Sequence, residues 1–238
     1  MTTRICVIGN SHVNALKTGW ADMASEQPNF DMTFFASKGD RLGQLDVQDG
    51  CLLTQDPELR ERLIFTSGGL DHIRLAEYDW FLVYGLQLRP GNIRMSLSEA
   101  VKARIAQDIL EASTNHQTMV KIRTACNRPI VIGHNPLRHT KSRNVDDFNY
   151  SVAMKHLHNA LDLQDVYLLG QPQETIENDR LTKAEYGIGA TKLKQSKADT
   201  DVEKRVDDLA HMNRKFGALY LQQLLDHITR TEKQNGFP

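Results

Sequence analysis

The sequence predicts a three-layer α/β/α fold, in which a five-stranded parallel sheet lies between two layers of helices. Three observations predict it: five short apolar runs recur along the chain, stretches with helical spacing separate them, and four of the five runs end in glycine. Continuous apolar runs are typical of strands that are buried on both faces, as they are in parallel sheets. A terminal glycine suits a tight turn out of a strand.

The expected strands cover residues 4–9, 31–36, 80–85, 129–133 and 166–170. The first expected helix carries Val13, Leu16, Trp20 and Met23 at spacings of three and four. Three more helices are expected over about 97–125, 150–161 and 212–228. Ser96 and Glu99 predict a capping box at the start of the first of these three. Five strands in this alternation favour the flavodoxin-like order 2-1-3-4-5.

We interpret residues 1–238 as a single domain with two long insertions, at about 40–78 and 171–207. Long excursions in α/β domains often carry specificity or act as lids. The first contains apolar pieces at 51–53 and 63–65, so we expect it to pack. The second is rich in Lys, Asp and Thr, and a poorly ordered surface loop is the alternative interpretation.

Composition excludes several classes of protein. The 29 basic and 30 acidic side chains give a net charge of -1, which argues against a dedicated nucleic-acid binder. No apolar run approaches the roughly 18 residues that a membrane span needs, so we expect no membrane-spanning segment. The three cysteines are far apart and show no zinc-binding spacing, and no signal-peptide pattern begins the chain. We therefore expect free thiols and a cytoplasmic protein.

A serine follows the first expected strand, in Gly9-Asn10-Ser11-His12. In open parallel sheets, ligands bind outside the carboxyl ends of the strands, where the strand order reverses. With the order 2-1-3-4-5 that point lies between the first strand and the third, which delivers Gly85-Leu86-Gln87. Ser11 is therefore a candidate nucleophile, and a simple helix N-cap is the alternative. A phosphate-binding loop is not favoured, because neither glycine-rich phosphate motif is present.

A second motif stands directly before the last expected helix, in Asp208-Leu209-Ala210-His211. An Asp and a His three residues apart can pair, carboxylate to Nδ1, which leaves Nε2 free to act as a base. A surface cap is the commoner explanation of such a pair alone. The combination with Ser11 favours a catalytic interpretation.

In these motifs and their order, the sequence resembles the SGNH/GDSL hydrolase superfamily. Gly9-Asn10-Ser11-His12 is similar to the block that holds the nucleophile, with Asn in place of the usual Asp. Gly39 is similar to the glycine whose N–H helps to form the oxyanion hole. Asp208 and His211 match the DxxH block. The GxND block is altered, since Gln87 stands where an oxyanion-binding Asn is usual, and Asn92 is an alternative donor.

The resemblance implies a serine esterase that cleaves a short, acetyl-type acyl ester, with a carbohydrate ester as a leading option. Ser11 would attack, His211 would transfer the proton and Asp208 would orient His211. The N–H groups of Ser11 and Gly39, with Gln87, would form the oxyanion hole. Two alternatives stay open: an acyltransferase with the same triad, and a non-catalytic module that binds a glycan or metabolite in a hydrolase-like crevice.

Other polar residues follow the same strand ends. Asn10, His12 and His134 are candidate substrate-binding residues, and His134 with Arg138 and His139 suits a polar or anionic group. Arg89 is a further candidate for binding a carboxylate or sulfate. We expect no metal site, because no motif such as HExxH is present, and no cofactor. The expected partner is a small-molecule or glycan ester.

Overall fold

The structure is a computed structural model that describes residues 2–139, 146–196, 199 and 210–234. Its centre is a five-stranded sheet with the order β2-β1-β6-β7-β8, in which every neighbouring pair is parallel. The strands are β1 (Thr3–Gly9), β2 (Phe30–Ala36), β6 (Trp80–Tyr84), β7 (Ile130–Gly133) and β8 (Val166–Leu169). The predicted order 2-1-3-4-5 is therefore confirmed.

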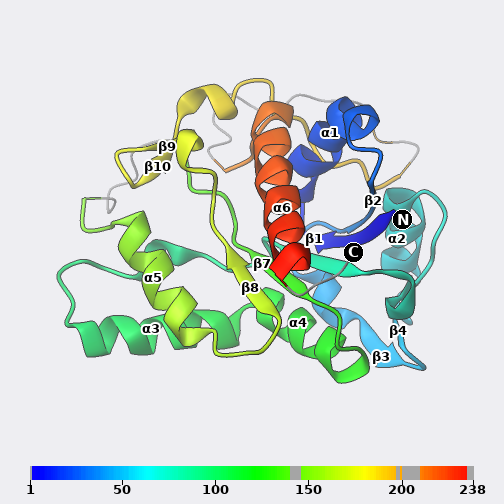
Figure 1. Cartoon of the computed structure of the whole chain (residues 1–238), viewed down its shortest axis with the longest axis horizontal. Coiled ribbons are helices and arrows are strands. Elements are labelled where there is room, and N and C mark those ends of the chain that lie inside the picture. The colour runs from blue at the N-terminus through cyan, green and yellow to red at the C-terminus, as the bar shows by residue number, and fades with distance from the viewer. Residues whose placement is uncertain (1, 140–145, 197–198, 200–209, 235–238) are drawn as a thin grey trace.

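Helices cover both faces of the sheet, which confirms the three layers (Figure 1). Alternate residues of each strand point to opposite faces: in β1, Ile5 and Val7 join one core cluster, and Cys6 and Ile8 join the other. The first cluster contains residues of α1 (Val13–Met23) and α6 (Arg214–Gln234). The second contains residues of α2 (Pro57–Ser67), α3 (Glu99–Ala112), α4 (Thr114–Ala125) and α5 (Tyr150–Ala160).

The strand register aligns four strand ends at one edge of the sheet. Gly9 of β1 pairs with Ala36 of β2 and with Tyr84 of β6, which in turn pairs with Gly133 of β7. The segments that follow these residues therefore leave the sheet at the same edge. They are the segments that carry the predicted site residues of the first four strands.

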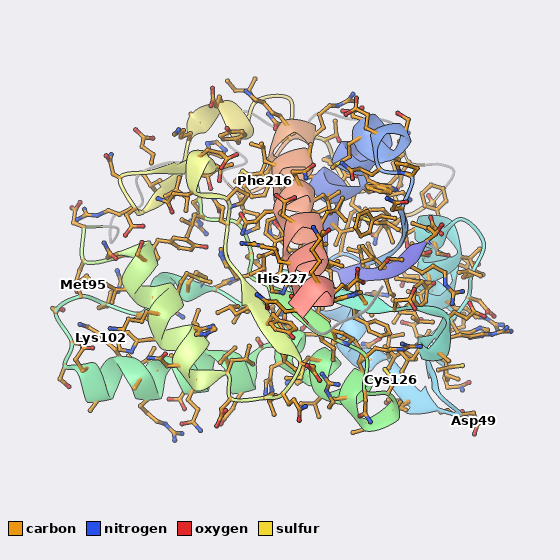
Figure 2. All side chains as sticks on the ribbon, in the orientation of Figure 1. Asp49, Met95, Lys102, Cys126, Phe216 and His227 are labelled. Carbon is orange, nitrogen blue, oxygen red and sulfur yellow. The ribbon has the colours of Figure 1, made fainter. Side chains whose placement is uncertain are left out.

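Helices α1 and α6 cross at very short range, side by side on one face of the sheet (Figure 1). A Cβ atom at Gly217 of α6 would overlap the carbonyl oxygen of Ala15 in α1, and one at Gly19 would overlap the backbone at Ala218. Only glycine permits this approach of the two backbones. Also on α6, Phe216 packs edge-on against Tyr186, and His227 packs edge-on against Tyr167 of β8; Figure 2 labels both residues of the helix.

The long helix expected over 97–125 is two helices, and the predicted cap is wrong. Ser113 ends α3 and caps α4, because its backbone is extended and its hydroxyl accepts a hydrogen bond from the His116 N–H. The cap of α3 is Ser98, whose side chain accepts from the Val101 N–H. Ser96 instead donates its hydroxyl to the carboxylate of Asp147 at 2.6 Å.

The break between α3 and α4 brings Asn115 into the core. Asn115 is fully buried, and its amide donates to the carbonyl oxygens of Val83 at 2.9 Å, Gly133 at 3.0 Å and Gly85 at 3.3 Å. One side chain thus ties together the carboxyl ends of β6 and β7, where the candidate site lies.

Both insertions contain ordered, packed structure. The first includes α2 and a small antiparallel sheet of β3 (Asp46–Gln48), β4 (Cys51–Leu53) and β5 (Ile73–Arg74). Leu52 and Leu63 are fully buried, as expected of its apolar pieces. The described part of the second insertion includes the hairpin β9 (Ile176–Glu177) and β10 (Leu181–Thr182). Our interpretation of residues 1–238 as one domain stays a prediction.

Short 3-10 helices occupy Ala24–Glu26, Arg41–Gln44, Leu75–Glu77, Pro90–Asn92, Gln173–Thr175 and Ala184–Tyr186. In the part of the chain that the structure describes, no helix is both long enough and apolar enough to cross a membrane.

Candidate active site

Ser11, near the start of the chain, contacts His211, near its end. The Ser11 Oγ lies 2.9 Å from the His211 Nε2, and 200 residues separate the two in sequence. His12, and not Ser11, stands at the N-cap of α1, and no side-chain bond caps that helix. The alternative interpretation of Ser11 as a helix cap is therefore wrong, and its hydroxyl is held by an imidazole instead.

The turn that presents Ser11 is fixed by its neighbours. The Asn10 Oδ1 accepts a hydrogen bond from the His12 N–H at 3.2 Å, and the Asn10 side chain packs over Gly85 after β6. A Cβ atom at Gly85 would stand 2.6 Å from that same Oδ1, and the φ of +76° there also favours glycine. Asn10 thus joins the segments after β1 and β6, the first and third strands of the predicted site.

His211 lies just outside α6, on a segment that Asn213 holds. The helix expected from about residue 212 to 228 is α6, which begins at Arg214 and extends to Gln234. The Asn213 Oδ1 accepts from the Phe216 N–H, its amide donates at 2.9 Å to the carbonyl oxygens of Glu185 and Ile188, and its N–H donates to Tyr186. Sequence reasoning missed this residue, although Asn just before a helix is a known N-cap signal.

The second insertion also holds the start of α1. The Asn14 amide donates to the Thr191 hydroxyl at 2.9 Å and to its carbonyl oxygen at 3.1 Å. The same insertion thus carries the acceptors for Asn14, near Ser11, and for Asn213, near His211. The described part of the insertion therefore holds both the segment after Ser11 and the segment after His211 in place.

His12 extends the pair toward a pocket. The imidazole rings of His12 and His211 stack with centroids 4.7 Å apart, and the His12 Nε2 lies 3.2 Å from the Asn135 Nδ2 after β7. The Asn135 Oδ1 is buried without a hydrogen-bond partner among the described residues. Sequence reasoning did not single out Asn135, because a polar residue in a loop gives no periodic signal.

Three further residues are predicted for the site, namely Gly39, Gln87 and Asp208. Gly39 lies in an exposed turn after β2, with a φ of +71°, and Ser37 before it donates its N–H to the Gly9 carbonyl oxygen. Gln87 is exposed and lines a hollow against α3, which adjoins the pocket described below and shares Arg89 and Asn92 with it. Asp208 lies outside the described residues.

His134 is a core residue. It is 2% exposed, its Nδ1–H donates to the Asn135 carbonyl oxygen at 2.6 Å, and its Nε2 accepts from the Tyr150 hydroxyl at 2.7 Å. Burial lowers the pKa of His134 to about 4, and the hydrogen bond with Asn135 opposes this shift only in part. The expectation that the His134 side chain contacts substrate is not met by this placement, since both ring nitrogens are engaged inside the protein.

A pocket of about 420 Å³ opens beside the Ser11–His211 pair. His12 and Ala210, the chain neighbours of Ser11 and His211, form part of its wall. The remaining wall comes from the segments after β6 and β7 and from the second insertion, with Asn135 and four arginines among its residues. Among the described residues, no group of three or more His, Cys, Asp or Glu is arranged to hold a metal ion.

The fold and this site define a three-layer α/β/α protein with a serine–histidine pair at the carboxyl edge of its sheet. Neither a protein-family model nor a curated protein matches the sequence. The structure is similar to the periplasmic domain of a lipopolysaccharide acetyltransferase from Salmonella ser. Paratyphi A, with 13% identity, a TM-score of 0.50, and coverage of 96% of this chain and 84% of that one. It also aligns with a possible lipase from Chitinophaga pinensis, with 12% identity, a TM-score of 0.42 and 99% of both chains covered. The first likeness shows a shared fold.

Proposed function

We propose that this protein is a serine esterase that cleaves a short acyl ester, as the resemblance to the SGNH/GDSL hydrolases implies. The observation that carries the proposal is the 2.9 Å separation of the Ser11 Oγ and the His211 Nε2. That distance lies within the hydrogen-bond range that a nucleophile and its general base require.

The reaction would proceed in two steps. The Ser11 Oγ attacks the acyl carbonyl while the His211 Nε2 accepts its proton, and the imidazolium then protonates the leaving alcohol. Water attacks the acyl-enzyme in the second step, and His211 again takes and returns the proton. For Nε2 to accept a proton, Nδ1 must carry one, and Asp208 is the proposed acceptor that holds this tautomer.

The oxyanion would be bound by the N–H groups of Ser11 and Gly39 and by a side-chain amide. In the described part of the chain, no group accepts a hydrogen bond from the Ser11 N–H. We propose Asn135 as the third donor, because its amide lies against His12 and in the pocket wall. The sequence predicts Gln87 as this donor, with Asn92 as the alternative. Gln87 lines an adjoining hollow that shares Arg89 and Asn92 with the pocket, and Asn92 lines the pocket itself.

A fluorophosphonate probe tests the proposal directly, because it reacts only with an activated serine. We expect it to label the wild-type protein, to label His211→Ala far more weakly and to leave Ser11→Ala unlabelled. Folded wild-type protein that resists the probe would instead favour the non-catalytic binding module. His211→Ala is also expected to lose turnover of 4-nitrophenyl acetate while retaining its fold.

Acyl transfer to a second alcohol is the alternative reaction with the same residues. One observation favours it, namely the shared fold with a domain of an acetyltransferase. Product analysis separates the two reactions. An added alcohol that receives the acyl group in preference to water, at millimolar concentration, would identify a transferase.

A further inference from the structure

The pocket beside Ser11 is positively charged, although the whole chain is not. Arg89, Arg94, Arg138 and Arg180 line it, and no Asp or Glu is among its described lining residues. The chain as a whole has a net charge of -1. The excess of positive charge is therefore a property of this pocket and does not follow from a basic composition.

Two of these arginines are paired or screened by acidic neighbours. Arg180 lies 3.5 Å from the carboxylate of Asp146, which is fully exposed. Asp147 accepts hydrogen bonds from Ser96, and the charge of Arg94 further lowers the pKa of its carboxyl. An exposed ion pair of this kind is weak and leaves a guanidinium available to a ligand.

The other two, Arg89 and Arg138, differ from them. In the part of the chain that the structure describes, no carboxylate lies within ion-pair distance of Arg89 or Arg138. Arg89 follows β6 and Arg138 follows β7, so the two come from the adjacent strand ends that also deliver Gln87 and Asn135. Two exposed guanidinium groups in one concave wall are a site for an oxyanion.

We propose that the ester substrate carries an anionic group, a carboxylate or sulfate, that Arg89 and Arg138 bind while the ester faces Ser11. This inference rests on the proposed function and narrows its substrate class to acylated acids, such as acyl esters of acidic sugars. A guanidinium binds either anion through two parallel N–H donors. The local positive field also raises the rate at which an anionic substrate enters the pocket.

A matched set of acetate esters tests the inference. The set comprises 4-acetoxybenzoate, its methyl ester, which has no charge, and 4-acetoxybenzenesulfonate. We expect kcat/KM to be about tenfold or more higher for a charged ester than for the methyl ester, which corresponds to one charge-assisted contact. Comparing kcat/KM for the benzoate and the sulfonate shows whether the pocket prefers a carboxylate or a sulfate-like group. The preference should shrink as salt is raised, because ions screen exposed charges.

Charge-removing variants locate the site. Arg89→Gln and Arg138→Gln should each bring the ratio of charged to neutral ester turnover toward one, through a higher KM for the charged ester. Arg128→Gln is the matched control, because Arg128 is exposed and precedes β7, at the opposite edge of the sheet. It should leave the ratio unchanged. An active enzyme with no preference for the charged esters would overturn the inference and leave the proposed function intact.

Binding to Ser11→Ala separates the inference from catalysis. Calorimetry with this variant measures the affinity for 4-acetoxybenzoate and for its methyl ester without turnover. We expect Ser11→Ala to bind the anion more tightly than the methyl ester, and the added change Arg138→Gln to remove that difference in affinity. This result would support the pocket assignment even if the wild type cleaved no ester. Equal or weaker binding of the anion would reject it.

Discussion

The backbone of Gly217 in α6 lies against the carbonyl oxygen of Ala15 in α1, in contact so close that no side chain fits between them. Ala15 lies four residues after Ser11, and Gly217 six residues after His211. The contact therefore fixes the relative position of the two helices that follow Ser11 and His211.

Gly217→Ala should destabilise the protein and weaken the contact between Ser11 and His211. A methyl group in this contact forces the helices apart, and overpacking costs about 1–3 kcal/mol, more than the roughly 1 kcal/mol by which Ala favours a helix. We expect the melting temperature to fall and probe labelling of Ser11 to slow. Gly91→Ala is the control, since an added Cβ there meets nothing within 4 Å. Equal melting temperatures for the two variants would contradict the close-contact argument.

Asp208→Asn should lower kcat strongly without unfolding the protein. The amide keeps the shape of the carboxylate but stabilises the imidazolium less, and comparable changes in a serine protease triad cost about 10⁴ in kcat. Asp207→Asn is a matched control one residue away and should retain activity. If both variants retained full turnover of 4-nitrophenyl acetate, Asp208 would not be the third member of a triad.

Asn135→Ala should lower kcat by about 10²–10³ if its amide binds the oxyanion, because one donor of an oxyanion hole contributes that much. Gln87→Ala should change kcat little, since Gln87 lines the adjoining hollow and is not among the lining residues of the pocket itself. The comparison requires kcat at saturating substrate and a circular dichroism spectrum of each variant. The reverse ranking would assign the donor to Gln87.

His134 should make the protein less stable at mildly acidic pH. The folded pKa of about 4 lies below the ordinary value of 6.5, so the folded state resists protonation. Its full contribution is present above about pH 6.5, is lost progressively down to about pH 4, and amounts to about 3 kcal/mol. His134→Asn, which does not titrate, should flatten the fall of unfolding free energy in this window. Identical pH profiles for wild type and His134→Asn would contradict the assignment.

Asn115→Ala should destabilise the edge of the sheet by about 1–3 kcal/mol, because it removes a buried amide that donates to three carbonyl oxygens. Asn115→Asp should be worse at neutral pH, because it replaces the donating amide with a charge that faces three oxygens. Urea unfolding measures both. An aspartate variant as stable as the wild type would show that the amide is not needed there.

The sequence predicted the sheet well because its signal is local. Each buried strand reads as a continuous apolar run, and the order follows from the alternation with helices. Ser11 and His211 were also predictable, since each stands in a short motif beside a strand or helix end. Their 2.9 Å contact depends on the crossing of α1 and α6, which Gly19 and Gly217 permit. The periodicity of the sequence does not predict that crossing.

The polar residues that hold the site were harder to predict. Asn115, Asn135 and Asn213 act through partners far away in sequence, and an asparagine in a loop or near a helix end carries no signal of its partner. The break at Ser113 was missed for a different reason, because the buried positions continue at a helical spacing across it. His134 was assigned to substrate since it follows a strand, but Tyr150, which engages its Nε2, comes from α5.

The separation of Ser11 and His211 by 200 residues also bears on how the protein folds. A chain synthesised from its N-terminus presents Ser11 early, but the His211 imidazole can reach it only after 200 further residues have been added. Non-local contacts of this kind form late and slowly, because the entropy of closing a long loop opposes them. The Ser11–His211 contact, on which the proposed activity depends, would therefore form late, and a partly folded chain would lack it.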